Sequence, residues 1–249
     1  MSGASAETTA AARPLPISET FRSLQGEGAL AGVPSFFIRL SGCNLRCRWC
    51  DTPYASWSPE STPRTLESIV AEAQASGVRH VVLTGGEPMI FDAIGPLTRR
   101  LDEAGMHLTI ETAGTVVRRP GEIACHLMSL SPKLANSTPL AGDPRDPSGS
   151  WRIRHEQRRW RPAVLQELLD AWPARQLKFV VTGPADLAEI DAMLEVLHGW
   201  RPEQVMLMPE GTSTPDPDAV AWVVRQCLDR GWRYCHRLHV ELFGDTRGT

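Results

Sequence analysis

Short apolar runs alternate with segments of helical periodicity along most of the chain. Near-continuous apolar runs, which are typical of parallel strands covered on both faces, fall near residues 35–40, 79–84, 107–111, 126–130, 177–182, 204–208 and 237–242. Apolar residues at helical spacing predict intervening helices that begin after Thr65 and near Ile94, and others over 163–171, 185–198 and 218–230. This order predicts an α/β fold, a partial (open) β/α barrel, with functional loops beyond the C-terminal ends of the strands.

Two stretches do not follow this alternation. Residues 1–16 are rich in Ala, Ser and Thr, offer little to bury and predict a disordered tail. The polar stretch 136–161 interrupts the rhythm and predicts an irregular excursion. A chain of 249 residues is a common length for a single α/β barrel, so we predict one domain over residues 17–249.

Composition and charge narrow the class of protein. Apolar residues make up 42% of the chain and charged residues 22%, which permits a core and excludes disordered and fibrous chains. The formal net charge of −3 provides no overall field that would attract nucleic acid. No apolar run approaches the ~18 residues that span a bilayer, and residues 1–13 lack the pattern of a secretion signal. We therefore expect a globular cytoplasmic protein without membrane contact and without direct nucleic-acid contact.

Three of the six cysteines stand close together after a predicted strand. Cys43, Cys47 and Cys50 are separated by three and then two residues, a spacing that can wrap one inorganic centre. Three protein ligands leave one metal position open, whereas four close a structural site. The alternatives are a zinc site completed by His80 or His126, and a thiol cluster without metal. The remaining cysteines lie in apolar patterns that predict small buried side chains: Cys125, Cys227 and Cys235.

Polar and glycine-rich segments follow the next three predicted strands. In the first, Gly85 and Gly86 let backbone carbonyls approach a ligand, and Glu87 offers an acceptor for an ammonium group. Taken alone, two successive glycines indicate only a turn. The other two polar clusters are residues 111–115 and 129–133. Because the C-terminal ends of parallel strands meet at one edge, these segments predict a shared ligand site.

The chain contains only two lysines beside 24 arginines. Lys133 falls in the polar cluster 129–133, which indicates that a compact ammonium group has a role there. Lys178 lies within the predicted strand at 177–182. We expect its side chain to extend to the rim of that strand.

The cysteine motif, with Trp49 before the third cysteine, resembles the signature of the radical S-adenosylmethionine (radical SAM) superfamily. The resemblance implies a 4Fe–4S cluster held by Cys43, Cys47 and Cys50, whose remaining iron binds S-adenosylmethionine. One electron delivered to the cluster would cleave the sulfonium and yield a 5′-deoxyadenosyl radical. The positions that the resemblance implies for S-adenosylmethionine are Trp49, Cys50, Asp51, Gly85, Gly86, Glu87, Gly114, Ser131, Pro132 and Lys133.

The segment before the cysteines narrows the resemblance. Its residues 19–28 and the run 37–43 are similar to the 7-carboxy-7-deazaguanine synthase family. Members of that family are carbon–nitrogen lyases of queuosine and 7-deazapurine biosynthesis, which convert 6-carboxy-5,6,7,8-tetrahydropterin to 7-carboxy-7-deazaguanine with loss of ammonia. Glu27 can accept the paired donors of a pterin edge, and Arg39 can bind a carboxylate. The implied substrate positions are Leu24, Gln25, Gly26, Glu27, Arg39, Thr112, His239 and Thr249.

The same resemblance implies further cofactors and partners. Thr52 corresponds to a ligand of Mg2+, an ion that takes few protein oxygens and keeps several waters. His239, near the predicted strand at 237–242, and Thr249 belong to a C-terminal segment that would fold over the substrate. An electron donor such as flavodoxin would reduce the cluster, and the enzyme would be a homodimer.

Two other functions stay open at this point. One is an activase that places a glycyl radical on a partner protein, and the other is a non-catalytic iron–sulfur or zinc binding protein. The segment 151–161 carries five arginines and two tryptophans. It predicts a solvated helix face in preference to a docking site for an acidic electron donor or for RNA.

Overall fold

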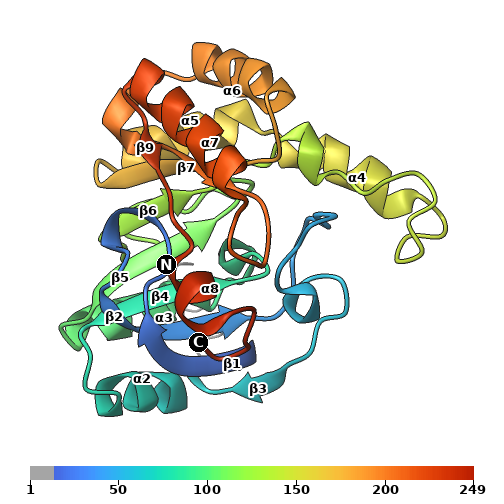
Figure 1. Ribbon diagram of the computed structural model, residues 1–249. Helices are drawn as coiled ribbons and strands as arrows, with labels where there is room; N and C mark the ends of the chain where they lie inside the picture. Colours follow the sequence, from blue (N-terminus) through green and yellow to red (C-terminus); the bar gives the residue numbers. More distant parts are fainter. Residues whose placement is uncertain (1–13) are drawn as a thin grey trace.

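The computed structural model describes residues 14–249, which form one mixed sheet flanked by helices (Figure 1). The strands are β1 (Leu15–Leu24), β2 (Pro34–Leu40), β3 (Thr62–Arg64), β4 (His80–Gly85), β5 (His107–Thr112), β6 (Leu127–Leu130), β7 (Arg175–Val181), β8 (Val205–Pro209) and β9 (Arg233–Tyr234). The helices are α2 (Leu66–Ala75), α3 (Ile94–Glu103), α4 (Ser150–Arg159), α5 (Pro162–Ala171), α6 (Ala185–Val196), α7 (Pro217–Arg230) and α8 (Leu238–Phe243). No helix in this part of the chain is long and apolar enough to cross a membrane.

The sheet is open. Its strand order is β3-β1-β2-β4-β5-β6-β7-β8-β9. Neighbouring strands from β2 to β9 run parallel, whereas β1 and β3 are antiparallel additions at one edge. The strand order begins at β3 and ends at β9, and these two strands do not pair, so the predicted partial barrel is confirmed.

Alternate residues of the central strands face opposite sides of the sheet. In β7, Leu177, Phe179 and Val181 pack in the main core, whereas Lys178 and Val180 line a cavity on the other face. This period of two is the ordinary geometry of a strand. The other strands contribute fully buried side chains to the same core: Ile38, Leu83, Ile110, Leu130 and Leu207. One face of the sheet therefore provides stability and the other is available for a ligand.

The apolar run at 237–242 forms the helix α8 and not the predicted strand. The last strand, β9, is only two residues long. The backbone N–H of Leu238 donates to the carbonyl of Gly26 (2.9 Å), so the run packs against the loop after β1 and does not pair with β8. A short apolar run fits a strand or a helix equally well, and here this tertiary contact decides between them.

The strand β1 is absent from the predicted elements because polar residues interrupt its apolar pattern. It begins at Leu15, and both Leu15 and Ile17 are buried. Residues 15 and 16 therefore belong to the sheet, which corrects the predicted end of the tail. Residues 1–13, the rest of that predicted tail, lie outside the described part of the chain.

The predicted excursion at 136–161 contains one α-helix, α4, which projects from the side of the barrel (Figure 1). Arg152, Ile153 and Arg154 are exposed on α4, as expected for a solvated face. His155 on the same helix is fully buried. The helix therefore has a solvent face and a second face that packs on the body of the protein.

Candidate active site

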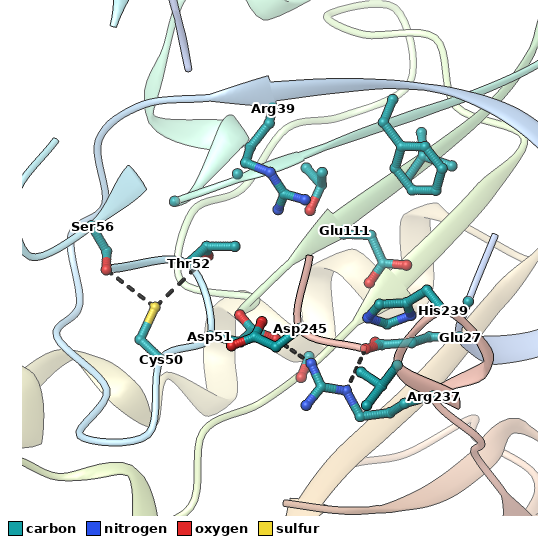
Figure 2. Close-up of a pocket in the computed structure, with 18 of the residues that line it drawn as sticks. Glu27, Arg39, Cys50, Asp51, Thr52, Ser56, Glu111, Arg237, His239 and Asp245 are labelled. Carbon is teal, nitrogen blue, oxygen red and sulfur yellow. Dashed lines mark hydrogen bonds and ion pairs between the residues drawn. The ribbon is translucent and has the colours of Figure 1, made fainter. Parts of the chain in front are cut away.

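A cavity of about 460 Å³ opens at the C-terminal ends of the parallel strands. Its walls come from the loops after β1 and β2, from the ends of β4, β5 and β7, from α8 and from the last residues of the chain (Figure 2). Loops that follow parallel strands meet at one edge, which is why segments far apart in sequence share this cavity. The predicted site residues that line it are Leu24, Gln25, Gly26, Glu27, Arg39, Cys43, Cys47, Trp49, Cys50, Asp51, Thr52, Gly85, Gly86, Thr112, Ser131, Lys133, His239 and Thr249.

Hydrogen bonds hold the cysteine loop (residues 41–50) in place. The Arg46 guanidinium donates to the carbonyls of Cys43 (2.8 Å) and Leu45 (2.7 Å), which curls the loop around this side chain. The backbone N–H of Arg46 donates to Nδ1 of His155 on α4 (3.1 Å), and Nε2 of His155 bonds to the Ser137 hydroxyl (2.9 Å). Burial lowers the pKa of His155 to about 4, so its imidazole is neutral and can accept this bond.

The thiols of Cys43, Cys47 and Cys50 all line the cavity, and none forms a disulfide. Burial raises the pKa of Cys43 to about 12 and also raises the pKa of Cys47. Cys50 raises the pKa of Cys43 further, and Cys43 and Cys50 both raise the pKa of Cys47 further. The three sulfurs are therefore close enough to interact electrostatically. Thiolates are the form that binds metal, and iron bound among them would offset the cost of their burial. The three sulfurs therefore fit a 4Fe–4S cluster, which they would hold with one iron left without a protein ligand.

The two histidines considered as zinc ligands are engaged elsewhere. The ring of His80 bonds to the hydroxyls of Ser35 (2.6 Å) and Thr109 (2.8 Å), and His126 accepts from the N–H of Leu108 (3.1 Å). Both histidines lie near the N-terminal ends of strands, whereas the cysteine loop follows the C-terminal end of β2, roughly 15 Å away along a strand. Within residues 14–249, no three His, Cys, Asp or Glu side chains, the three cysteines included, are grouped to share a single metal ion, whereas a 4Fe–4S cluster binds each cysteine through a different iron. A zinc site with either histidine is therefore wrong.

Gly85 and Gly86 lie directly against the backbone of the cysteine loop and of β2. A Cβ atom on Gly86 would overlap the carbonyl oxygen of Gly42, and one on Gly85 would overlap that of Leu40. The N–H of Gly86 donates to the carbonyl of Leu40 (3.0 Å), and the N–H of Glu87 donates to the carbonyl of Gly42 (2.9 Å). Gly85 also has a φ of +128°, which side chains rarely adopt. The two glycines thus allow the cysteine loop to approach β4.

We expect Gly86→Ala to push the cysteine loop away from β4, to lower the iron content after anaerobic reconstitution and to destabilise the fold by about 1–3 kcal/mol. Gly183→Ala is the matched control, because a Cβ atom there meets open space. Iron per chain and urea unfolding measure both effects. Equal iron content and equal stability in the two variants would contradict this role of Gly86.

Three of the residues predicted to bind S-adenosylmethionine lie behind the cavity wall: Glu87, Gly114 and Pro132. The carboxylate of Glu87 is fully buried, and it accepts from the Thr112 hydroxyl (2.8 Å) and from the N–H of Ala113 (2.8 Å). Burial raises the pKa of Glu87, and these hydrogen bonds oppose the shift. In this structure Glu87 therefore positions the end of β5, and an incoming ammonium group would have to displace these donors.

A buried network of charges lines the side of the cavity opposite Cys50 (Figure 2). The Lys178 ammonium donates to Glu27 and to Oε2 of Glu111 (3.0 Å). Arg237 forms ion pairs with Oε1 of Glu27 (3.2 Å) and with Asp51. Burial alone would raise the pKa of Glu27, but Lys178 and Arg237 together outweigh it and hold that pKa well below its usual range. Glu27 is therefore ionised at neutral pH.

Neutral side chains extend this network to neighbouring strands. Glu111 accepts from the Gln25 amide (3.3 Å) and from the Ser129 hydroxyl (3.1 Å). Gln176 donates to Ser129 (2.8 Å) and accepts from the N–H of Ala29 (2.8 Å). The loop after β1 is thereby tied to β5, β6 and β7, which fixes the orientation of Glu27.

His239 lies on α8 and packs against the backbone of Gly26, where a Cβ atom would overlap the imidazole. Its position on a helix corrects the predicted strand, but its predicted place at the cavity holds. Burial lowers the pKa of His239, and the nearby carboxylate of Glu27 opposes that shift. Glycine at position 26 thus lets an imidazole close the cavity beside Glu27.

Arg39 belongs to a second charged group in the cavity wall. Its guanidinium donates to Glu19 (2.7 Å), which also accepts from the Tyr54 hydroxyl (2.9 Å). Arg247 reaches the same carboxylate (3.3 Å) and lies over the Tyr54 ring (4.1 Å). Burial raises the pKa of Tyr54 to about 12, so the phenol stays protonated and donates. These contacts hold the last residues of the chain, including Thr249, against the cavity.

The sequence interpretation missed Lys178 and Arg237 as members of the site, whereas Glu111 fell in the predicted ligand cluster 111–115 without a role of its own. Lys178 was expected to extend to the rim of its strand, but it is buried between two carboxylates. The available signal was a single lysine within a buried apolar strand, because a buried ammonium needs an anionic partner. Of the cysteines predicted to be buried, Cys227 and Cys235 are, whereas Cys125 is partly exposed.

Comparisons with known proteins identify the family of this chain. Residues 37–172 match the model of the Radical SAM superfamily. The 7-carboxy-7-deazaguanine synthase of Rhodopirellula baltica is 48% identical over 251 residues, which cover 98% of this chain and 94% of that relative. The chain belongs to the 7-carboxy-7-deazaguanine synthase family. Another synthase of this family, from Halobacterium salinarum, is 45% identical and covers 94% of this chain and 93% of its own length.

A solved structure agrees with this assignment to the 7-carboxy-7-deazaguanine synthase family. The crystal structure of QueE from Escherichia coli matches with a TM-score of 0.65 and 29% identity, over 90% of this chain and 94% of that one. Membership confirms the predicted class, a radical SAM enzyme of queuosine biosynthesis, and implies a 4Fe–4S cluster and S-adenosylmethionine. It also favours this function over the activase and the non-catalytic binding protein.

Proposed function

We propose that this protein converts 6-carboxy-5,6,7,8-tetrahydropterin to 7-carboxy-7-deazaguanine and releases ammonia. One observation carries the proposal: the same cavity holds three cysteine thiols and, opposite them, the polar side chains suited to a pterin. Figure 2 shows Cys50 on one side of this cavity and Glu27, Glu111 and His239 on the other. The cavity therefore presents one side suited to a cofactor and another suited to a small substrate.

The cysteine side of the cavity fits the cluster and S-adenosylmethionine. Cys43, Cys47 and Cys50 would hold a 4Fe–4S cluster, which when bound supplies the electron that cleaves S-adenosylmethionine and starts hydrogen abstraction. Lys133 offers a fixed cation, because its ammonium donates to the carbonyl (3.0 Å) and hydroxyl (2.8 Å) of Ser131. Both residues line the cavity next to the cysteine loop and would orient the cofactor.

The opposite side fits the pterin. Glu27 is kept ionised by Lys178 and Arg237, so its oxygens can accept the 2-amino group and the adjoining ring N–H. Gln25 lines the same wall and can serve the neighbouring carbonyl. Arg39, although paired with Glu19, lines the cavity with a guanidinium that can fork to the substrate carboxylate. The chain's own contribution is thus to orient the substrate and exclude water.

Glu27→Gln is expected to lower kcat/KM for the pterin by about ten- to hundredfold. The variant replaces one of the two acceptor oxygens that face the 2-amino group and the ring N–H with a donor, so one of the two hydrogen bonds is lost. Glu67→Gln is the control, since Glu67 is an exposed carboxylate that pairs with Arg100 outside the cavity. Unfolding curves of both variants separate recognition from stability. Unchanged pterin turnover by Glu27→Gln would show that Glu27 does not recognise the substrate edge.

We propose that Thr52 holds Mg2+ through its hydroxyl, next to the substrate carboxylate. Thr52 lines the cavity, and its hydroxyl oxygen lies 3.8 Å from the Cys50 sulfur, between the two halves of the site. The neighbouring carboxylate of Asp51 is paired with Arg237, which leaves the hydroxyl as the oxygen donor from this segment.

Thr52→Ala is expected to weaken Mg2+ activation about tenfold or more, whereas Thr52→Ser keeps it because it retains the hydroxyl. The measurement is the rate of pterin turnover as Mg2+ is titrated into chelator-treated protein. An identical Mg2+ dependence in the alanine variant would remove Thr52 from the metal site.

The experiment that tests the function is turnover by the purified, anaerobically reconstituted protein. We expect about four irons per chain, release of 5′-deoxyadenosine under reduction, and formation of 7-carboxy-7-deazaguanine from the pterin, followed by mass spectrometry. Formation of 5′-deoxyadenosine without any conversion of the pterin would overturn the proposed substrate. Transfer of a radical to a glycine of a second protein would identify the activase alternative.

A further inference from the structure

An arginine-rich cluster lies on the outside of the cysteine loop, with Arg154 exposed, Arg158 half-buried and Arg46 buried against the Trp151 ring. The guanidinium of Arg46 lies over the ring of Trp151 on α4 (3.9 Å to the ring centroid), and Arg154 lies near the same ring (5.3 Å). Arg158, one turn further along α4, donates to the carbonyl of Asn44 (3.3 Å). We call Arg46, Trp151, Arg154 and Arg158 the arginine patch. None of the four lines the cavity, so the patch has no place in substrate binding as described above.

Arg46 lies near the sulfurs of the cysteine loop, whereas the charges of Arg154 and Arg158 are not neutralised by a carboxylate of the described chain. Arg46 and Arg158 bond to backbone carbonyls, and among residues 14–249 no ion pair joins the patch to a carboxylate. The nearby acids have other partners: Asp146 accepts from a backbone N–H of α4 (2.8 Å), and Glu156 pairs with Arg159 (2.9 Å). In a chain with a net charge of −3, this concentration of cations is complementary to an acidic partner.

The arginine patch is bonded to the segment that carries the cysteines. Arg46 stands between Cys43 and Cys47 in the sequence, and its guanidinium holds the carbonyl of Cys43 (2.8 Å). The contact of Arg158 is with Asn44, the residue that follows Cys43. A protein seated on the patch would therefore lie against the cluster's own loop, on the side away from the cavity. It could deliver an electron while S-adenosylmethionine and the pterin occupy the cavity.

The residue types at the surface favour a protein over a nucleic acid. Ile153, the neighbour of Arg154 in the sequence of the same helix, is 58% exposed. Exposed apolar side chains beside arginine and tryptophan are characteristic of protein interfaces. The Trp151 ring is covered by Arg46 and approached by Arg154, so it is poorly placed to stack on a base. Figure 1 shows that α4 projects from the barrel, where a partner can reach it.

We propose that the arginine patch is the docking site of an acidic one-electron donor protein that reduces the cluster. The proposal rests on the proposed function, since the electron is needed only where a cluster is held by Cys43, Cys47 and Cys50. In the transfer the donor loses one electron and the cluster gains it, with no bond formed or broken and no proton required. It replaces the expectation that segment 151–161 is merely a solvated helix face.

Arg154→Glu tests the proposal, because Arg154 is exposed and does not hold the cysteine loop. The matched control is Arg225→Glu on α7, an exposed arginine with the same change in net charge. Purified flavodoxin, an acidic flavoprotein, is the probe. We expect Arg154→Glu to slow cluster reduction by reduced flavodoxin about tenfold at low salt, with the difference shrinking as salt is added. Reduction by dithionite, which needs no docking, should be equal in all three proteins.

Two further measurements separate the possible failures. Affinity for flavodoxin is titrated in the iron-free protein, where Arg154→Glu should weaken binding and Arg225→Glu should not. If Arg154→Glu and the unmodified protein have equal rates of cluster reduction and equal affinities for flavodoxin, the docking site is overturned. It is also overturned if Arg154→Glu loses tRNA binding while its reaction with flavodoxin is unchanged. If the unmodified protein holds no cluster, or does not cleave S-adenosylmethionine with dithionite, the proposed function is refuted instead. The affinities of the iron-free proteins for flavodoxin would then still test whether the arginine patch is a docking site.

Discussion

Lys178→Met is expected to destabilise the folded protein by about 3–5 kcal/mol, because it removes the cation shared by Glu27 and Glu111, whose side chains are each only 16% exposed, and leaves Arg237 as the only cation paired with Glu27 in the described chain. Methionine has a similar length and no charge, so the loss is mainly electrostatic. Urea unfolding at neutral pH measures it. Lys178→Arg, which keeps the positive charge, should recover part of the stability, and Arg225→Met on the exposed face of α7 should change little.

The pH dependence of Lys178→Met distinguishes lost charge pairing from lost packing. In the unmodified protein the lowered pKa of Glu27 contributes stability that is present above the ordinary carboxyl pKa of 4.5 and lost only as the pH falls through the lower folded value. Without Lys178, less of the effect of burial on Glu27 is offset, so the pKa of Glu27 rises and the penalty for its ionised form grows with pH. The variant's deficit should therefore shrink between about pH 8 and about pH 5. A deficit that does not change with pH would contradict the electrostatic account.

Replacement of any one of Cys43, Cys47 and Cys50 by alanine is expected to abolish cluster binding, S-adenosylmethionine cleavage and pterin turnover together. Two remaining sulfurs leave two irons of a 4Fe–4S cluster without protein ligands, and such a cluster is not retained. Iron and sulfide per chain after reconstitution, followed by product assays, measure the loss. Each variant should remain folded, because the three thiols contribute little to the main core.

Cys227→Ala is the matched control for the cysteine variants. Cys227 lies on α7 and is buried against the core, outside the cavity, so its replacement should cost about 1 kcal/mol of stability and leave the iron content unchanged. Cys235 is a poorer control, since its sulfur accepts from the N–H of Gly28 (3.2 Å) beside Glu27. Full iron content in Cys43→Ala, Cys47→Ala or Cys50→Ala would refute the assignment of that residue as a ligand.

Local pattern was sufficient for the central parallel strands. The predicted strand at 177–182 corresponds to β7 at Arg175–Val181, and the predicted helix after Thr65 begins there because the Thr65 hydroxyl accepts from the N–H of Ser68 (3.3 Å). The hydrophobic pattern did not predict the elements correctly where a strand is buried on one face only or where the chain leaves the sheet. Polar residues hide β1, and α8 is a helix because it packs on the loop at Gly26.

What the sequence by itself determined is the chemistry of the cysteine loop, since Cys43, Cys47 and Cys50 are kept together by eight residues of covalent chain whatever surrounds them. The tertiary structure alone decided how the opposite side of the cavity is built. Lys178 meets Glu27 across 151 positions and Glu111 across 67, and Arg237 meets Glu27 across 210. No local periodicity encodes such pairs. They form because an open parallel sheet brings the C-terminal ends of its strands to one edge, where a buried charge is stable only beside a partner.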